Sequence, residues 1–179
     1  MTRTRLLVLL AAALTAITLA VPAQAATPSC GITWGSTAES GPTALPVPGA
    51  AVAAVRAGRH DCYDRLVLDV RGVRSLATWH ASYVSRVTED ASGRPVALRG
   101  GAFLQISVGA NSAIPPSPEL VPVTGFSTFR QVASAGSFEG VTNLGLGVRA
   151  RLPFRVFTLT GIPGSTNGVR LVVDVAHRW

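Results

Sequence analysis

The sequence predicts an all-β protein, specifically a small antiparallel β-sandwich built from two pseudo-repeated halves. Short segments in which apolar and polar residues alternate are separated by Gly- and Pro-rich turns, and no amphipathic helix pattern interrupts them. In addition, the segment RLVLDV at residues 65–70 returns as RLVVDV at residues 170–175, with five of the six positions identical. Strands at this spacing are typical of sandwiches and small barrels.

Residues 1–25 have the layout of a secretory signal peptide. Two arginines precede an apolar run at residues 6–21, and the tripeptide AQA, which ends at Ala25, fits a small-x-small cleavage site. An uncleaved membrane anchor is the alternative, but the run is shorter than the roughly 20 residues that a spanning helix needs. We therefore expect a secreted, extracellular protein that has no transmembrane segment after cleavage.

The rest of the chain predicts a single domain at residues 51–179, preceded by an irregular segment at residues 26–50 that is rich in Pro, Ser, Thr and Gly. Two cysteines, Cys30 and Cys62, remain after cleavage, and an even pair in an exported protein predicts a disulfide. Metal binding by two cysteines so far apart is the weaker alternative. The disulfide would fix the N-terminal segment to the turn that opens strand 65–70.

The chain is basic, with a formal net charge of +7, and every basic side chain is Arg. A GC-rich genome favours Arg codons and explains this usage without any functional demand. A basic exported protein could also be held by anionic cell-wall polymers. The arginines are scattered and are not interleaved with aromatic residues, so nucleic-acid binding is not expected.

The strand pattern continues along the domain. Strands are expected at residues 64–71, 78–88, 103–108, 141–152, 154–160 and 169–176. Residues 50–57 fit either a strand or one helical turn, and residues 126–140 are ambiguous. The prolines at residues 111–122 exclude a central strand there and predict a surface loop. The Asn-Gly pair that ends residues 164–168 predicts a hairpin.

The two copies of the repeated strand have two plausible arrangements. If they pair antiparallel and in register, Arg65 faces Asp174 and Asp69 faces Arg170, which places opposite charges across the strands. If they lie in different sheets related by pseudo-symmetry, these pairs do not form. We favour separate sheets, because repeats in sandwiches often map onto separate sheets.

No catalytic motif is recognisable. The sequence has no G-x-S-x-G elbow, no metal-binding histidine spacing, and no P-loop or dinucleotide fingerprint, so we predict no catalytic residue, metal or cofactor. One histidine, His60, lies close in sequence to Asp61 and Asp64. This group could be a cation site, the acid–base pair of a minimal hydrolase, or a turn in which an Asp accepts backbone N–H groups. We favour the turn and expect all three side chains on an exposed rim.

A second candidate ligand-binding group shares one side of the predicted strand at residues 141–152. It comprises Asn143, Gly145, Gly147, Arg149 and Arg151. Glycines on one face of a strand allow a ligand to approach the backbone closely, and arginines can grip carboxylates, such as those of peptidoglycan, in a bidentate manner. The alternative, which we favour, is that the glycines make room for an aromatic side chain from a neighbouring strand or mark a bulge. We regard this face as the better place for a ligand than the turn at His60.

The run VRAGRHDCYDRLVLDVRG, followed by SFEG, LGLGVRARLPFRVFTL and RLVVDVAHRW, resembles the AMIN-like domain proteins of actinobacteria. The resemblance covers about residues 52–179, together with Cys30 and the upstream Trp34. These proteins are similar to AMIN domains, which are small β-sandwiches of two related halves and noncatalytic modules of exported envelope proteins. The resemblance therefore implies a secreted, noncatalytic cell-envelope module that binds cell-wall glycan or peptide. The alternative is a partner of another envelope protein, docked through an exposed sheet edge.

Overall fold

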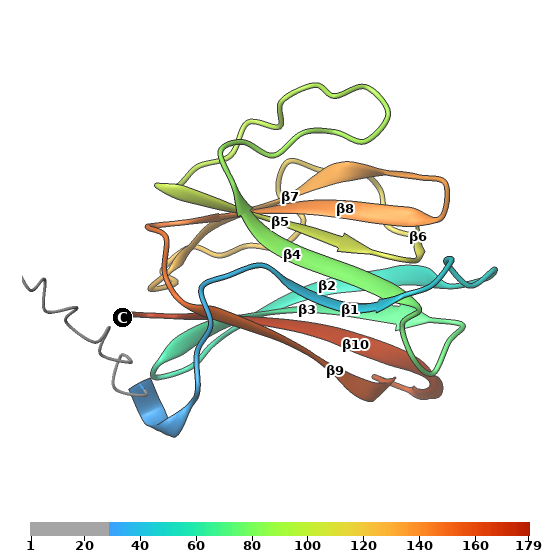
Figure 1. Cartoon of the computed structure of the whole chain (residues 1–179), viewed down its shortest axis with the longest axis horizontal. Coiled ribbons are helices and arrows are strands. Elements are labelled where there is room, and N and C mark those ends of the chain that lie inside the picture. The colour runs from blue at the N-terminus through green and yellow to red at the C-terminus, as the bar shows by residue number, and fades with distance from the viewer. Residues whose placement is uncertain (1–28) are drawn as a thin grey trace, which may run out of the picture.

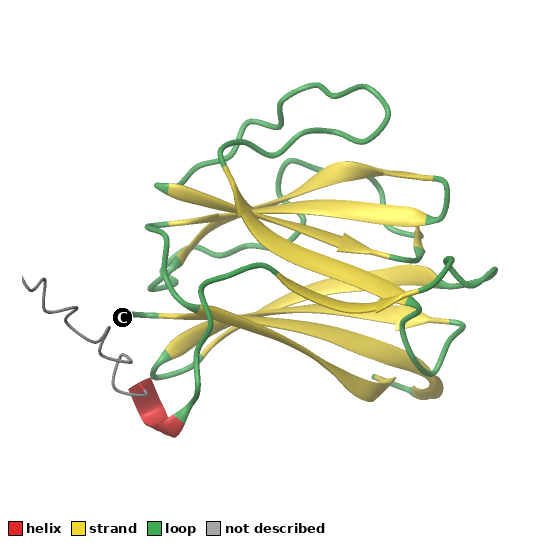
Figure 2. Ribbon diagram, in the orientation of Figure 1, coloured by secondary structure: helices red, strands yellow, loops and turns green. Residues whose placement is uncertain are grey.

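The computed structural model describes residues 29–179 and shows two five-stranded β-sheets stacked on each other (Figure 1). The only helical element in that range is a single 3-10 turn, η1 (Ser29–Gly31), as Figure 2 shows. The predicted all-β sandwich is therefore confirmed. The signal peptide predicted at residues 1–25 lies outside the described residues.

The two sheets have different strand orders. Sheet I has the order β6 (Asn111–Ser112), β2 (Ala51–Arg59), β3 (Tyr63–Arg71), β10 (Ser165–Ala176) and β9 (Phe154–Ile162). Sheet II has the order β1 (Glu39–Thr43), β4 (Thr78–Val84), β5 (Ala102–Val108), β8 (Val141–Val148) and β7 (Phe129–Phe138). All neighbouring strands are antiparallel except β2 and the short β6, which run parallel.

The core lies between the sheets and is built by the period-two pattern of the strands. Leu66 and Leu68 of β3, Leu104 and Ile106 of β5, and Leu144 of β8 are all essentially inaccessible to water. Successive side chains of a strand point to opposite faces, so alternate positions line one layer. Burying each such side chain stabilises the fold by about 1.5–3 kcal/mol.

The two copies of the repeated strand are hydrogen-bonded neighbours in sheet I, so our preference for separate sheets was wrong. Strands β3 and β10 pair antiparallel, with Arg65 opposite Asp174 and Asp69 opposite Arg170. The outward Val172 of β10 is only 1% exposed, so both faces of this strand are buried. Such a strand belongs at the centre of a sheet, and the second copy stabilises it from one side.

The N-terminal segment is more ordered than predicted, because residues 39–43 form β1 at the edge of sheet II. The disulfide between Cys30 and Cys62 is confirmed. Gly35 forms an antiparallel bridge with Phe154 of β9. The segment therefore contacts sheet I first and then joins sheet II, which ties the two layers together along one side (Figure 1).

The ambiguous regions are also resolved. Residues 51–59 form a strand rather than a helical turn, and residues 129–138 form β7. Two predicted strands end early, at Val84 and Val148, and the residues that follow are loops. No helix in the described part of the chain is long and apolar enough to cross a membrane.

Candidate functional site

The glycine face of β8 is covered by the protein's own chain. A Cβ atom added to Gly145 would lie 2.6 Å from Leu98 Cδ1, and one added to Gly147 would collide with the backbone oxygen of Arg99. Both contacts come from the loop of residues 85–101, which stands over the outer face of sheet II in Figure 1. The glycines therefore make room for packing, as the alternative stated, but the space is filled by a loop rather than by an aromatic side chain from a neighbouring strand.

Asn143 belongs to the same covered face and is 4% exposed. Its Nδ2 atom donates to Asp90 Oδ2 at 2.6 Å, and its Oδ1 atom accepts from the hydroxyl of Ser107. Asp90 also donates its backbone N–H to Ala135 O at 3.0 Å. Asn143 thus fastens the covering loop to the sheet, and a ligand could reach these positions only by displacing that loop.

Arg149 and Arg151 lie beyond the end of β8 and are exposed. Arg149 Nη2 donates to the backbone oxygen of His177, and the Arg151 guanidinium lies 4.8 Å from the centre of the Tyr83 ring. Neither arginine extends the glycine face, because the chain leaves sheet II after Val148. Ligand binding at these two arginines stays a prediction.

The group at the β2–β3 turn is divided between two environments. His60 and Asp61 are exposed, and the His60 ring stacks on Tyr63 with 4.4 Å between ring centres. Asp64 is fully buried and accepts backbone N–H groups from Thr128 at 2.5 Å and Phe129 at 3.1 Å. Asp64 therefore accepts backbone N–H groups at the start of β7 rather than within its own turn, and it lies inside the fold rather than on the exposed rim that we predicted.

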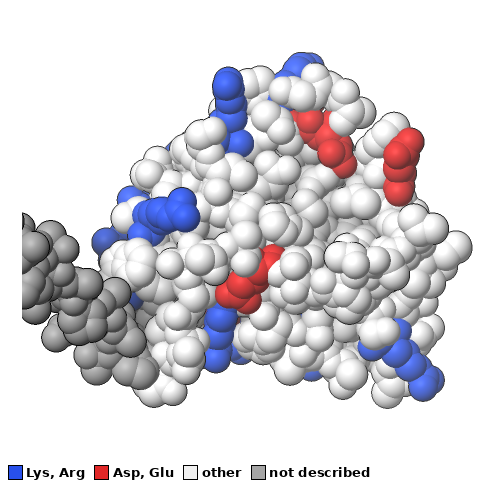
Figure 3. All heavy atoms as spheres, in the orientation of Figure 1, with Lys and Arg blue, Asp and Glu red and all other residues white. Residues whose placement is uncertain are grey.

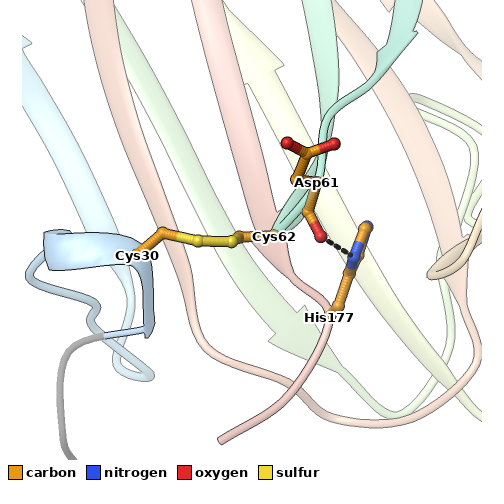
Figure 4. Close-up of a disulfide and its surroundings, with 4 residues drawn as sticks. All are labelled: Cys30, Asp61, Cys62 and His177. Atoms are coloured by element: carbon orange, nitrogen blue, oxygen red, sulfur yellow. Dashed lines mark hydrogen bonds between the residues drawn. A yellow bond between two sulfur atoms is a disulfide. The ribbon is translucent and has the colours of Figure 1, made fainter.

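The histidine beside Asp64 is His177, which the sequence analysis did not select. His177 Nε2 lies 3.1 Å from Asp64 Oδ1, and Nδ1 lies 3.2 Å from Asp61 O. Figure 4 shows the Asp61 backbone oxygen facing His177 while its carboxylate points away. Both ring nitrogens face acceptors of the protein, so neither is left to activate a nucleophile. The pair joins the C-terminus to β3 and, through Asp64, to the start of β7.

Metal binding finds no support in the described part of the chain, where no group of three or more His, Cys, Asp or Glu residues could hold an ion. Both cysteines are joined in the disulfide, which links η1 to the β2–β3 turn (Figure 4). Charged side chains are dispersed over the surface in the view of Figure 3 rather than gathered in one patch.

The outer face of sheet I is different, because no strand or long loop of residues 29–179 packs over it (Figure 1). Its central cluster, which we call the arginine–aromatic face, consists of Trp34, Tyr63, Arg65, Arg155, Phe157 and Asp174. The register explains the cluster: Arg65 of β3, Asp174 of β10 and Arg155 of β9 lie side by side in one row across three strands. Trp34 is carried there by the N-terminal segment, between the disulfide and the Gly35 bridge.

Asp174 is the centre of this cluster. It is fully buried, and Arg65 binds it in a bidentate manner, with Nε–Oδ1 at 2.6 Å and Nη2–Oδ2 at 2.8 Å. Arg155 binds Oδ2 through Nε at 2.9 Å and Nη2 at 2.8 Å. The hydrogen bonds that Arg65 donates to Asp174 raise the pKa of Arg65 above its ordinary value. Two guanidinium groups share one carboxylate, which leaves the cluster with an excess positive charge.

Aromatic rings flank both guanidinium groups. Arg65 lies 5.2 Å from the ring centre of Tyr63, and Arg155 lies 5.4 Å from Trp34 and 5.0 Å from Phe157. These distances are within the range of cation–π attraction, which favours guanidinium groups over ring faces. The side chains of Arg65 and Arg155 are 23% and 31% exposed, whereas Asp174 is shielded. Solvent therefore meets rings and positive charge on this face.

The model of the AMIN-like domain family matches residues 50–177. The chain belongs to the AMIN-like domain family. Comparisons with curated proteins and with solved structures returned no match. The matched range contains β2 to β10 and ends at His177, whereas Cys30 and Trp34 lie upstream of it. The family and the disulfide are both consistent with an extracellular envelope protein.

Proposed function

We propose that this AMIN-like protein is a secreted, noncatalytic binding module that holds cell-wall glycan or peptide on the arginine–aromatic face. The observation that carries the proposal is the open outer face of sheet I, where Trp34, Tyr63 and Phe157 surround two partly exposed guanidinium groups. Membership of the AMIN-like family and the disulfide support a place in the envelope.

The chemistry of this face suits a polymer that carries both sugar rings and carboxylates. Aromatic rings offer flat apolar surfaces, on which the apolar faces of sugar rings can pack. Guanidinium groups bind carboxylates with charge-assisted hydrogen bonds, which are stronger than neutral ones. Cell-wall peptidoglycan contains both groups.

The proposal that the protein is noncatalytic rests on the contacts that its reactive side chains make. His177 directs both ring nitrogens to acceptors of the protein, and both cysteines are oxidised. His60 stacks on Tyr63 beside the arginine–aromatic face, where it extends the aromatic surface. Of the two carboxylates that a hydrolase built on His60 could use, Asp61 and Asp64, the second is buried and hydrogen-bonded to His177.

The test is co-sedimentation of the purified protein with purified cell walls. We expect the protein to sediment with the walls, and we expect Trp34→Ala and Phe157→Ala to weaken binding by about tenfold, since a ring stacked on a ligand contributes on the order of 1 kcal/mol or more. Arg94→Ala is the control, because this arginine pairs with Glu89 on the loop over sheet II and is 75% exposed. It should sediment like the unchanged protein.

Two outcomes contradict the proposal. No sedimentation at low salt would remove wall binding, because low ionic strength favours charge-driven contacts. Equal binding by the Trp34→Ala, Phe157→Ala and Arg94→Ala variants would show that the arginine–aromatic face is not the binding site. Recovery of one crosslinked envelope protein from cells, without binding to purified walls, would support the protein-partner alternative instead.

A further inference from the structure

A separate hollow of about 750 Å³ opens beside the start of β7. It lies between the loop that follows β6 and the end of the loop over sheet II. Its lining includes Arg99, Glu119, Val123, Phe126, Phe129 and Arg130. The volume is within the range of about 300–1,000 Å³ that small-molecule sites occupy. The hollow shares no lining residue with the arginine–aromatic face, so the inference does not depend on that face.

The floor of the hollow is apolar and fixed. Phe129 is 1% exposed, and the Phe126 ring stacks on it with 5.8 Å between ring centres and 8° between planes. Arg130 holds the loop in place, because its Nη1 atom donates to Phe126 O at 3.2 Å and to Phe129 O at 2.8 Å. The floor therefore has a defined shape before any ligand arrives.

The rim is charged and accessible. Arg99 Nη2 lies 2.5 Å from Glu119 Oε1 and donates to Arg130 O at 3.1 Å. The side chains of Arg99 and Glu119 are 64% and 44% exposed, so this ion pair can open at little cost. Within the described residues the Arg99 side chain uses Nη2 for these contacts, which leaves its Nε and Nη1 donors for another acceptor. Arg99 pairs with Glu119, and Arg130, whose guanidinium donates to backbone oxygens, adds a second positive group to the lining, so the rim has an excess positive charge.

From this arrangement we propose that the hollow binds the free carboxylate end of a short peptide whose last residue is apolar. The peptide carboxylate replaces Glu119 on Arg99, where a bidentate pair can form. The last side chain packs against Phe126 and Val123. Such an end can come from a protein, with an L residue last, or from a cell-wall peptide, with a D residue last. Both sources present the same carboxylate chemistry.

Isothermal titration calorimetry on the whole protein tests the inference. The probes are N-acetyl-dialanine in its L,L and D,D forms, each compared with its C-terminal amide. We expect at least one acid to bind and both amides to bind about tenfold more weakly, because the amide lacks the charge that Arg99 recognises. A preference for the L,L acid identifies a protein end as the source, and a preference for the D,D acid identifies a wall peptide.

Two substitutions of the rim should act in opposite directions. Arg99→Ala should weaken binding of the acid about tenfold, whereas Glu119→Gln should tighten it severalfold, because Glu119 competes with the ligand for Arg99. Arg94→Ala removes an exposed arginine of the same kind away from the hollow and should change nothing. Urea unfolding of each variant checks that the fold is intact. No heat with either acid, equal binding of acid and amide, or weaker binding by Glu119→Gln would overturn the inference.

Discussion

The two outer faces of the sandwich are built on opposite plans. On the outer face of sheet II, β8 carries small or amide side chains, Gly145, Gly147 and Asn143, and a loop of the same chain covers them. The outer face of sheet I is open, and arginines and rings cover its buried carboxylates, of which Asp174 is the most enclosed. On the covered face, a loop packs against the sheet. On the open face, charge pairs and ring contacts shield the buried carboxylates.

This difference teaches how a strand pattern should be interpreted. Small residues on one face of a strand leave space, and in a folded chain that space is filled first by the chain itself. Alternating Arg and Asp on a strand can satisfy one another across neighbouring strands, so that face needs no cover. The open face is therefore the one that remains available to a ligand.

The largest expected effect concerns the carboxylates of the repeated strands. Asp174→Asn should lower the free energy of unfolding by about 3 kcal/mol, because two guanidinium groups lose a fully buried partner. Asp69→Asn should cost about 1 kcal/mol, because its partner Arg56 has a side chain that is 46% exposed and can turn to water. Urea unfolding measures both. Equal costs for the two variants would show that the number of arginine partners does not matter.

Glycine substitutions compare the faces directly. Gly147→Ala should destabilise the protein by about 2–3 kcal/mol, because the new methyl group would overlap the backbone oxygen of Arg99. Gly58→Ala, on the open face, should change stability by less than about 0.5 kcal/mol, because its Cβ would meet only His60 Nε2, at 3.8 Å. Urea unfolding again provides the measurement. A Gly147→Ala variant as stable as Gly58→Ala would mean that the covering loop is not in place.

Substitution of Glu39 or Glu89 should change the stability of the protein slightly, and the two changes should have opposite signs at pH 7. Burial raises the pKa of Glu39, although the N–H of Val156 and the charge of Arg155 oppose the shift. A raised folded-state pKa means that the stability contributed by this group is present at low pH and is lost as pH rises through that pKa. Glu39→Gln should therefore match the unchanged protein near pH 3 and exceed its stability at pH 7, by less than about 0.5 kcal/mol after screening by solvent.

Glu89, on the loop over sheet II, is the matched control. Hydrogen bonds from Ser92 and Arg94 lower its pKa, so its contribution is present at neutral pH and is lost as pH falls through the folded-state pKa. Glu89→Gln should therefore be less stable than the unchanged protein at pH 7 and equal to it at low pH. Thermal unfolding between pH 3 and pH 7 would show the two trends, and trends of the same sign would contradict these assignments.

The sequence was sufficient to predict the structural features that depend on local pattern. Alternation identified the inward positions Leu66, Leu104 and Leu144, and the cysteine count in an exported chain predicted the disulfide. It did not decide whether the two repeated strands pair, because the opposite charges of Arg65 and Asp174 allow pairing without requiring it. It also could not show the contact between Asp64 and His177, which are 113 positions apart in the chain.

The covering of the glycine face could not be predicted from the sequence for the same reason, because it depends on a contact between separate segments. Gly145 and Gly147 were predicted either to admit a ligand or to make room for packing, and the loop of residues 85–101 fills that space, although no property of the strand itself identifies the covering segment. The sequence indicated Trp34 only as part of the AMIN-like resemblance. Its place over Arg155 depends on the disulfide and on the Gly35 bridge acting together.

Amide hydrogen–deuterium exchange with soluble cell-wall fragments tests the central claim, that the open face of sheet I is the binding surface. We expect the fragments to slow exchange in β9 and in residues 33–36, which carry two of the three rings and one arginine of the arginine–aromatic face. Exchange in β8 and in residues 85–101 should stay unchanged. Slowed exchange confined to β8 and its covering loop would contradict the claim and would indicate that the glycine face is the binding site.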